Sequence, residues 1–291
     1  MSPGYGRTYL RRNRSPRRLP GMQTASSMPG SCGLCKAEGV SLCYSDLLPK
    51  AISRWLIKSE LIEKGNRNPV FITSRRAVQM NFRVAEEFLC LECEGRLNRQ
   101  GETWVLRNSY RGVKNFPIQS LLADAPPIAV RESFRLIDGR ALPDVEMDKL
   151  VFFATSIFWK ASAREWRFID HWDRLEFGPY EEKFRSFLNH EADFPDSVSL
   201  VISVSGNPNP HVGAIYPYMA ARVSGTRQFR FSIPGMAFWL HQGNLPEHLK
   251  EFCAHRTGRI CFVPDLNKIY LDEAMPMIAN AKPSGVLGDV N

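Results

Sequence analysis

Two pairs of cysteines in this chain have the spacing of a metal site. Two residues separate Cys32 from Cys35, and two separate Cys90 from Cys93. Each pair can direct two thiolates from one tight turn at the same ion, and two pairs supply the four sulfur ligands that structural Zn²⁺ prefers. Gly33, inside the first pair, suits a turn in which a positive φ is often needed. The alternative is four ordinary buried thiols, which are common singly and less expected as two matched pairs.

The chain between the two pairs must bring them together. The 54 intervening residues are too many for a compact zinc ribbon, so this segment must fold back. Residues 40–43 have the pattern of a strand, and apolar residues at helical spacing after Pro49 predict a helix. Residues 86–91 enter the second pair, and residues 94–100 continue as a polar helix. This order of turn, strand, helix, insertion, turn and helix is typical of a treble-clef zinc module, which we place at residues 31–122.

Three short motifs of this module resemble a bacterial family of HNH-endonuclease-like proteins. They are Cys32-x2-Cys35, the run Tyr44-Ser45-Asp46-Leu47-Leu48-Pro49-Lys50, and Leu89-Cys90-x2-Cys93-Glu94. The family pattern is Cys-x2-Cys, Ser-His-x-x-Pro-Lys and Leu-Cys-x2-Cys-Glu, and the resemblance is specific over residues 31–100. It implies a treble-clef, ββα-type zinc module and the hydrolysis of DNA phosphodiesters. In active HNH enzymes the histidine that ends the first strand is the general base, and a downstream His or Asn helps to hold a divalent metal at the scissile phosphate.

This sequence departs from the family pattern at the position of the catalytic histidine. Asp46 stands there, and all six histidines lie at or beyond residue 171. An aspartate could bind Mg²⁺, but an ordinary pKa of about 4 makes it a weak base for water at neutral pH. Asn98, after the second cysteine pair, is a candidate secondary metal ligand; the alternative is a solvent-facing helix residue. Glu94 either orients the second pair or lies in the first turn of a helix, where acidic residues are favoured.

Basic residues of the same module could contact nucleic acid. Lys50, Arg54 and Lys58 recur at i, i+4 and i+8 on one predicted helical face, and Arg96 and Arg99 follow the second cysteine pair. Side chains placed in this way are suitable contacts to phosphate. Acidic residues nearby partly cancel their charge, so a solvated surface of mixed charge is the alternative interpretation.

The formal net charge of +8 over 291 residues is unevenly distributed. Residues 1–30 carry six arginines and no lysine or acidic residue, residues 31–120 carry a net +5, and residues 121–291 carry a net −3. We interpret residues 1–30 as a disordered basic tail, because few large apolar side chains are present to offset the entropy of ordering. The tail could screen phosphate, act as a targeting presequence or be a non-essential extension. The nucleic-acid hypothesis therefore rests on residues 31–120 and on the family resemblance.

The second half of the chain is predicted to be an α+β domain of open role, with a mostly antiparallel sheet over residues 145–291. Residues 123–127 are a candidate boundary that precedes it. Aromatic-rich residues 147–166 predict a buried helix, and residues 178–188 predict a second helix. Short strands are predicted at 197–205, 218–223, 228–233, 236–240 and 259–263, and a short helix at 247–255.

These observations lead to one preferred function and two alternatives. No apolar run is long enough to span a membrane, and seven cysteines without a secretory signal favour a reducing, cytoplasmic location. We expect a degenerate HNH-like module that holds Zn²⁺ and binds nucleic acid or a protein partner without cutting. The first alternative is an active nuclease that uses Asp46, a histidine from the second half, and Mg²⁺ or Mn²⁺. The second is a structural zinc clip in a protein-interaction protein.

Overall fold

The fold is known for most of the chain. The computed structural model describes residues 29–64, 69–73, 76–79, 83–112, 114–168, 171–210, 213–223 and 225–284. Residues 1–28, which hold almost all of the basic tail proposed from the sequence, lie outside the described residues. In the described part of the chain, no helix is both long enough and apolar enough to cross a membrane.

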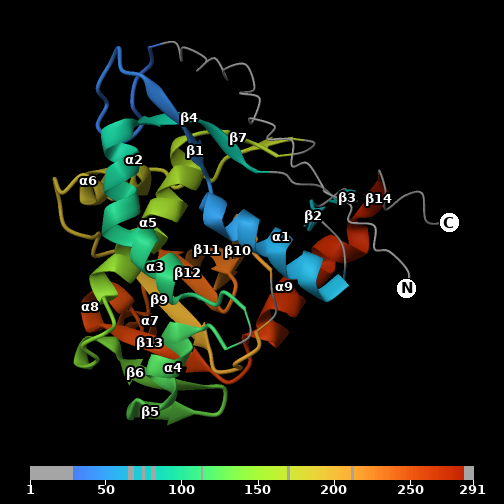
Figure 1. The fold of residues 1–291 in the computed structure, drawn as a ribbon. Helices are drawn as coiled ribbons and strands as arrows, with labels where there is room; N and C mark the ends of the chain where they lie inside the picture. The colour runs from blue at the N-terminus through green and yellow to red at the C-terminus, as the bar shows by residue number, and fades with distance from the viewer. Residues whose placement is uncertain are drawn as a thin grey trace, which may run out of the picture.

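One seven-stranded sheet organises the molecule, in the order β10–β11–β12–β9–β13–β6–β5 (Figure 1). Neighbouring strands pair antiparallel, except that β13 and β9 are parallel. The predicted α+β class and mostly antiparallel sheet are therefore confirmed. The strands are β5 (Pro127–Arg131), β6 (Phe134–Asp138), β9 (Val198–Ser205), β10 (Ile215–Val223), β11 (Thr226–Ile233), β12 (Met236–Gln242) and β13 (Arg259–Val263).

The helix α5 (Met147–Ala163) covers the apolar face of this sheet and is itself covered by other helices (Figure 1). Its sequence is apolar nearly all the way round, which is typical of a helix buried on every side. The ring of Phe153 lies 5.8 Å from that of Phe238 in β12 and 6.2 Å from that of Phe231 in β11. The helices on its other side are α2 (Leu91–Leu97), a π-helical turn η1 (Asn98–Glu102), α3 (Thr103–Asn108) and α6 (Tyr180–Leu188).

Two antiparallel strands pack against this helical layer, and the cysteine pairs lie at one end of them; we call these strands the hairpin, although a long insertion separates them in the sequence. Strand β1 (Leu42–Asp46) pairs antiparallel with β4 (Ala85–Cys90), so the strand predicted at residues 40–43 begins two residues later and ends at Asp46. Helix α1 (Lys50–Lys64) follows Pro49 as predicted. The insertion forms a small sheet of β2 (Val70–Ile72) and β3 (Arg76–Gln79), to which the C-terminal strand β14 (Lys282–Ser284) adds in parallel.

One buried apolar core runs through both halves of the chain, from Cys32 to Phe262. Residues 124–126, within the candidate boundary, simply connect α4 to β5, and both β5 and β6 precede the predicted 145–291 domain. The predicted helix 147–166 ends at Ala163, and Trp166 instead starts a short strand. The remaining elements are α4 (Pro117–Ala123), η2 (Gly139–Ala141), β7 (Trp166–Arg167), β8 (Trp172–Asp173), α7 (Glu247–Glu251), α8 (Ala254–Thr257) and α9 (Leu266–Asn280).

The close crossing of η1 and α5 at Gly101 gives a testable prediction. A Cβ on Gly101 would lie 2.8 Å from the backbone nitrogen of Phe153, which cannot move independently of its helix. We expect Gly101→Ala to lower the free energy of unfolding by about 1–3 kcal/mol, as overpacking of a tight core does. Gly95→Ala is the matched control, because its Cβ would meet only the flexible end of Arg99. Alanine there should raise helix propensity and stabilise by ~0.5–1 kcal/mol. Equal effects of the two changes in urea denaturation would contradict the predicted constraint.

Candidate metal centre

The four cysteines of the two pairs converge at the end of the hairpin. Their Sγ atoms all lie within 4.8 Å of one another, and the Sγ atoms of Cys35 and Cys90 are 3.9 Å apart. Sulfurs at Zn–S distances of about 2.3 Å form a tetrahedron with edges of about 3.8 Å, so the cluster has nearly the size of an occupied site. It is the one group of this kind among the described residues, and its cysteines form no disulfide. The four thiols can therefore hold a metal ion.

The first pair is shaped by a tight turn and by one close contact. The N–H of Cys32 donates to the carbonyl of Ala37, and the N–H of Lys36 donates to the carbonyl of Cys32, both at 2.9 Å. The prediction that Gly33 supplies a positive φ is wrong, because Lys36 has the left-handed backbone, at φ 61°. Glycine is needed at residue 33 for space: a Cβ there would lie 2.1 Å from the ring of Phe88.

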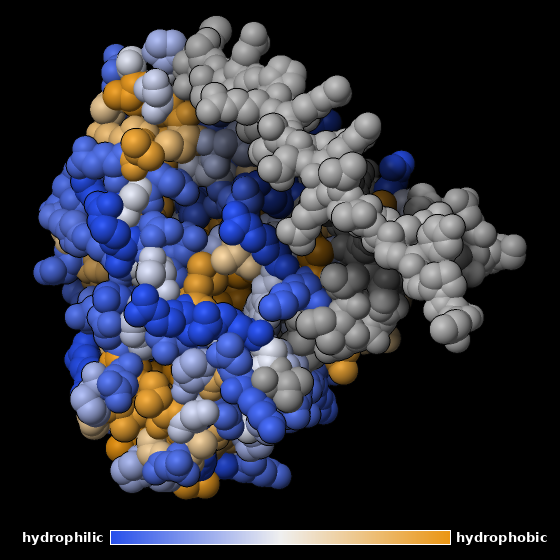
Figure 2. Space-filling view, viewed as in Figure 1, coloured by the Kyte–Doolittle hydropathy of each residue, from blue (hydrophilic) through white to orange (hydrophobic). Residues whose placement is uncertain are grey.

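The second pair links the end of β4 to the start of α2. The backbone N–H of Cys90 donates to Sγ of Cys32 at 3.3 Å, so the two pairs are joined even before any ion is considered. Cys93 is buried in the first turn of α2. Leu91 is 77% exposed, and apolar residues gather over this end of the molecule (Figure 2). The cysteine cluster thus has a buried side against the core and an outer side near the surface.

The pKa values of two thiols in the cluster indicate how it ionises. Burial raises the pKa of the Cys32 thiol, but hydrogen bonds from the backbone of Cys90, Cys35 and Leu34 outweigh it and lower the pKa to about 7. Burial and the neighbouring thiols raise the pKa of Cys93. One thiolate therefore forms readily near neutral pH, whereas ionisation of all four thiols requires a bound cation to stabilise them.

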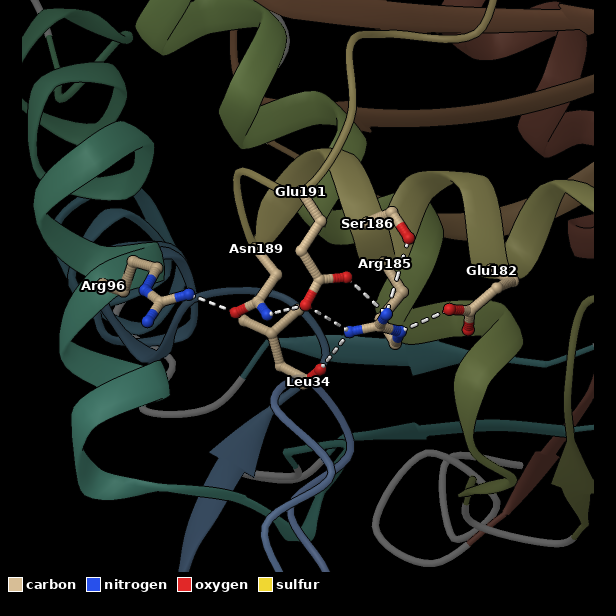
Figure 3. A network of polar contacts seen from close by, with 7 residues as sticks. All are labelled: Leu34, Arg96, Glu182, Arg185, Ser186, Asn189 and Glu191. Atoms are coloured by element: carbon tan, nitrogen blue, oxygen red, sulfur yellow. Dashed lines mark hydrogen bonds and ion pairs between the residues drawn. The ribbon is translucent and has the colours of Figure 1, made fainter.

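A polar network fastens both cysteine pairs to the second half of the chain (Figure 3). Arg185 of α6 donates to the carbonyl of Leu34, inside the first pair, at 2.9 Å, and it forms ion pairs with Glu182 and Glu191. Asn189 donates to Glu191 and accepts from Arg96 of α2. Arg96, expected from the sequence to contact phosphate, is thus engaged within the fold.

Residue His190 completes this network beside Asn189. Its Nε2 lies 2.8 Å from the side-chain oxygen of Gln100 in η1, and its φ of 61° is the strained left-handed region for a residue with a Cβ. Such a backbone persists where the surrounding contacts hold it. The loop after α6 is therefore fixed at several points to the helix that follows the second cysteine pair.

Asp46, at the position of the family's histidine, is occupied by an ion pair. Its carboxylate accepts two hydrogen bonds from Arg83, at 2.7 and 2.6 Å, and its carbonyl accepts one from Nζ of Lys160 at 2.9 Å. Among the described residues, no histidine forms a hydrogen bond or ion pair with it. Asn98 lies on the exposed surface of η1, where its Oδ1 accepts from Thr103 at 2.7 Å. No contact joins Asn98 to Asp46 in the described structure.

The basic residues predicted on α1 lie at the surface. Lys50, Arg54 and Lys58 are exposed, and they form no ion pair with any residue whose side chain is described. Arg99 is also exposed, on η1. Of the five basic residues that the sequence suggested as nucleic-acid contacts, Arg96 alone forms a hydrogen bond or ion pair with a residue whose side chain is described.

Sequence reasoning missed a cluster of polar side chains beside Asp46. Ser45 donates to Glu94 at 2.8 Å, and the charges of Lys160, Glu94 and Asp46 act on Glu102 in the π-helical turn. Burial raises the pKa of Glu102; the charge of Lys160 opposes the rise, and the charges of Glu94 and Asp46 add to it. Lys160 is only 3% exposed. A lysine inside a long aromatic helix was a visible signal of such a cluster, whereas the π-helical turn has no known signature in the sequence.

Metal binding is the first prediction from this geometry. Each chain should contain one zinc ion, and Cys90→Ser should lose it together with several kcal/mol of stability, because the ion links two distant segments. Cys253→Ser, which changes a buried cysteine outside the cluster, should keep the metal. Plasma mass spectrometry measures the metal content, and chemical denaturation measures the stability. A full complement of zinc in Cys90→Ser would refute the site.

The raised pKa of Glu102 predicts a pH-dependent effect. A carboxyl whose pKa is higher in the folded state stabilises the fold below its unfolded pKa and loses this contribution as pH rises through the folded pKa. Glu102→Gln should therefore raise the melting temperature at pH 8 and lose this advantage near pH 4. Glu132→Gln, at an exposed position, should show no such pH dependence. An advantage of Glu102→Gln that is independent of pH would contradict the assignment.

The arrangement can hold a metal ion at one end of the hairpin and places an ion-paired carboxylate at the other. Comparison of the sequence and the structure with known protein families, curated proteins and solved structures finds no match, so inferences about function rest on the residues of this chain.

Proposed function

We propose that this protein is a zinc-stabilised, HNH-like module that binds nucleic acid without cutting it. The ion pair of Asp46 with Arg83 is the observation that carries this proposal. A general base must offer a free lone pair to the attacking water. Both oxygens of this carboxylate already accept a charge-assisted hydrogen bond from one guanidinium, so the carboxylate is engaged in an ion pair and does not face a water alone.

The treble-clef assignment is supported by the order of elements around the cysteines. One pair precedes β1 and the other lies between β4 and α2, so a hairpin and a helix bracket the cluster. Four thiolates around Zn²⁺ leave a local charge of −2 and no open position for water, which is the form of a structural site. We place the protein in the cytoplasm, because thiolates of this kind need a reducing compartment.

The proposed nucleic-acid surface is the basic face of α1. Lys50, Arg54 and Lys58 repeat about every 6 Å along the helix axis, over a length of about 12 Å. These three cations pair with no acidic residue whose side chain is described, and we infer that they can contact the phosphate backbone. Arg96 does not belong to this surface, since Asn189 and Glu92 hold it.

Specific observations favour two other functions. Glu102 has a raised pKa beside Asp46, which suits a general base in a nuclease that requires Mg²⁺ or Mn²⁺. Among the described residues, however, no group of three or more carboxylates or histidines comes together closely enough to hold such an ion. Tyr44 is 64% exposed and Leu91 is 77% exposed on the cysteine hairpin, which suits a zinc clip that contacts a protein partner.

Binding and cleavage of DNA test the proposal. The full-length protein should bind a labelled 30-base-pair duplex in fluorescence anisotropy with an affinity that falls steeply with salt. Changing Lys50, Arg54 and Lys58 together to glutamine should lower the slope of log K against log salt by about 2.7, at roughly 0.9 for each phosphate contact. Plasmid DNA should remain uncut with Mg²⁺ or Mn²⁺.

Two controls make this test specific. Glutamine at Arg131, Lys149 and Lys250 removes the same charge elsewhere and should leave the slope nearly unchanged. Replacing the six tail arginines in the full-length chain (7, 11, 12, 14, 17 and 18) shows how much of the binding comes from the tail. Cleavage that disappears in Asp46→Ala would overturn the non-cutting assignment, and a slope unaffected by the α1 changes would overturn the surface.

A further inference from the structure

The positive charge of the first half is concentrated in one segment of the sequence. Residues 50–79 contain seven lysines and arginines and two acidic residues, a net +5 that equals the whole excess of residues 31–120. The parts of the module that carry the cysteines are therefore neutral overall. The excess belongs to α1 and to the insertion that forms β2 and β3.

The C-terminal strand adds a lysine to this basic region. In the parallel pairing of β14 with β3, Lys282 lies directly opposite Arg76. Both side chains are exposed, and neither forms an ion pair with a described residue. Like charges directly opposite each other on neighbouring strands are destabilising. The backbone of Arg76 is nevertheless fixed, since its carbonyl accepts from the N–H of Thr73 at 2.8 Å and its N–H donates to Oγ1 of Thr73 at 3.0 Å.

The small sheet is anchored near the place where α1 begins. The ring of Phe71 in β2 lies 5.7 Å from that of Tyr216, and the side chain of Tyr216 hydrogen-bonds to the backbone of Val84. The carbonyl of Val84 accepts from the N–H of Leu47, three residues before α1, at 2.9 Å. Only five residues join the end of α1 to β2, which limits that separation to about 20 Å. In Figure 1, β2, β3 and β14 are drawn on the side of the molecule toward which the second half of α1 runs.

We propose that Arg76 and Lys282 form a second phosphate-binding position, which continues the basic face of α1 onto the sheet β14–β3–β2. This inference rests on the proposed nucleic-acid binding. It specifies the path that the phosphodiester backbone of the nucleic acid takes across the protein. The partner is a phosphodiester backbone, because a polyanion offsets the repulsion between the two cations and releases condensed counterions. Exposed lysines and arginines of this kind position nucleic acid without reading its sequence. The C-terminal strand is therefore part of the binding surface, although it lies about 200 residues from α1 in the sequence.

A double variant, Arg76→Gln with Lys282→Gln, tests the second position in the full-length protein. The probe is a labelled 20-base-pair DNA duplex, measured by fluorescence anisotropy from low to moderate salt. The variant should weaken binding roughly tenfold and lower the slope of log K against log salt by about 1.8, because two phosphate contacts are lost. Its melting temperature should be unchanged or higher, since the repulsion between Arg76 and Lys282 is removed.

Two further variants control for charge and folding. Arg131→Gln with Lys250→Gln removes the same charge from β5 and α7 and should bind like the wild type. Arg76→Lys with Lys282→Arg keeps the charges and should retain the wild-type slope. The triple change of Lys50, Arg54 and Lys58 to glutamine serves as the reference for the proposed function. If it weakens binding while Arg76→Gln with Lys282→Gln binds like the Arg131 and Lys250 control, the second position is wrong and the proposed function stands. If the wild-type protein fails to bind the duplex even at low salt, both are wrong.

Discussion

Four sulfur atoms that come from segments 54 residues apart must meet within 4.8 Å, and much of the first half is shaped by this constraint. The hairpin β1–β4 brings the second pair beside the first, and the ring of Phe88 then fills the space that Gly33 leaves open. The same ring stacks on Trp159 of α5 at 5.3 Å and meets the edge of Trp166 at 5.8 Å. The turn that carries the first cysteine pair thus packs directly against the aromatic core. A metal ion bound there would stabilise the packing of this core as well as the turn itself.

The second half of the chain contributes to this centre as a scaffold. Arg185 hydrogen-bonds inside the first cysteine pair, while Asn189 and His190 contact the helix after the second pair. Because these contacts come from one helix and the loop that follows it, a single packed element holds both pairs in register. Displacement of α6 would break the contacts to both cysteine pairs. We therefore expect the stability of the metal centre to depend on the packing of the second half.

Short-range sequence patterns correctly predicted the elements whose structure depends on residues close by in the chain. The cysteine spacing, the helix after Pro49, the buried helix from Met147 and the alternating strand at β9 all follow from nearest-neighbour chemistry. The errors and omissions concern distant contacts. The reason for Gly33 lies in Phe88, 55 residues away, and the partner of Arg96 lies 93 residues away. The pairing of Lys282 with Arg76 likewise depends on where the chain end returns, which no window of sequence reveals.

The distribution of charge separates the metal centre from the proposed binding surface. Four thiolates around a divalent ion are net negative, and Glu94 directly follows Cys93 in the chain. On the proposed function, a polyanion binds at α1 and the small sheet, away from the cysteine end. Asp46 lies between these regions, at the start of the turn into α1, where a free carboxylate would repel phosphate. The Arg83 ion pair offsets that repulsion and occupies both carboxylate oxygens, so in the proposed module one contact would both favour binding and oppose catalysis.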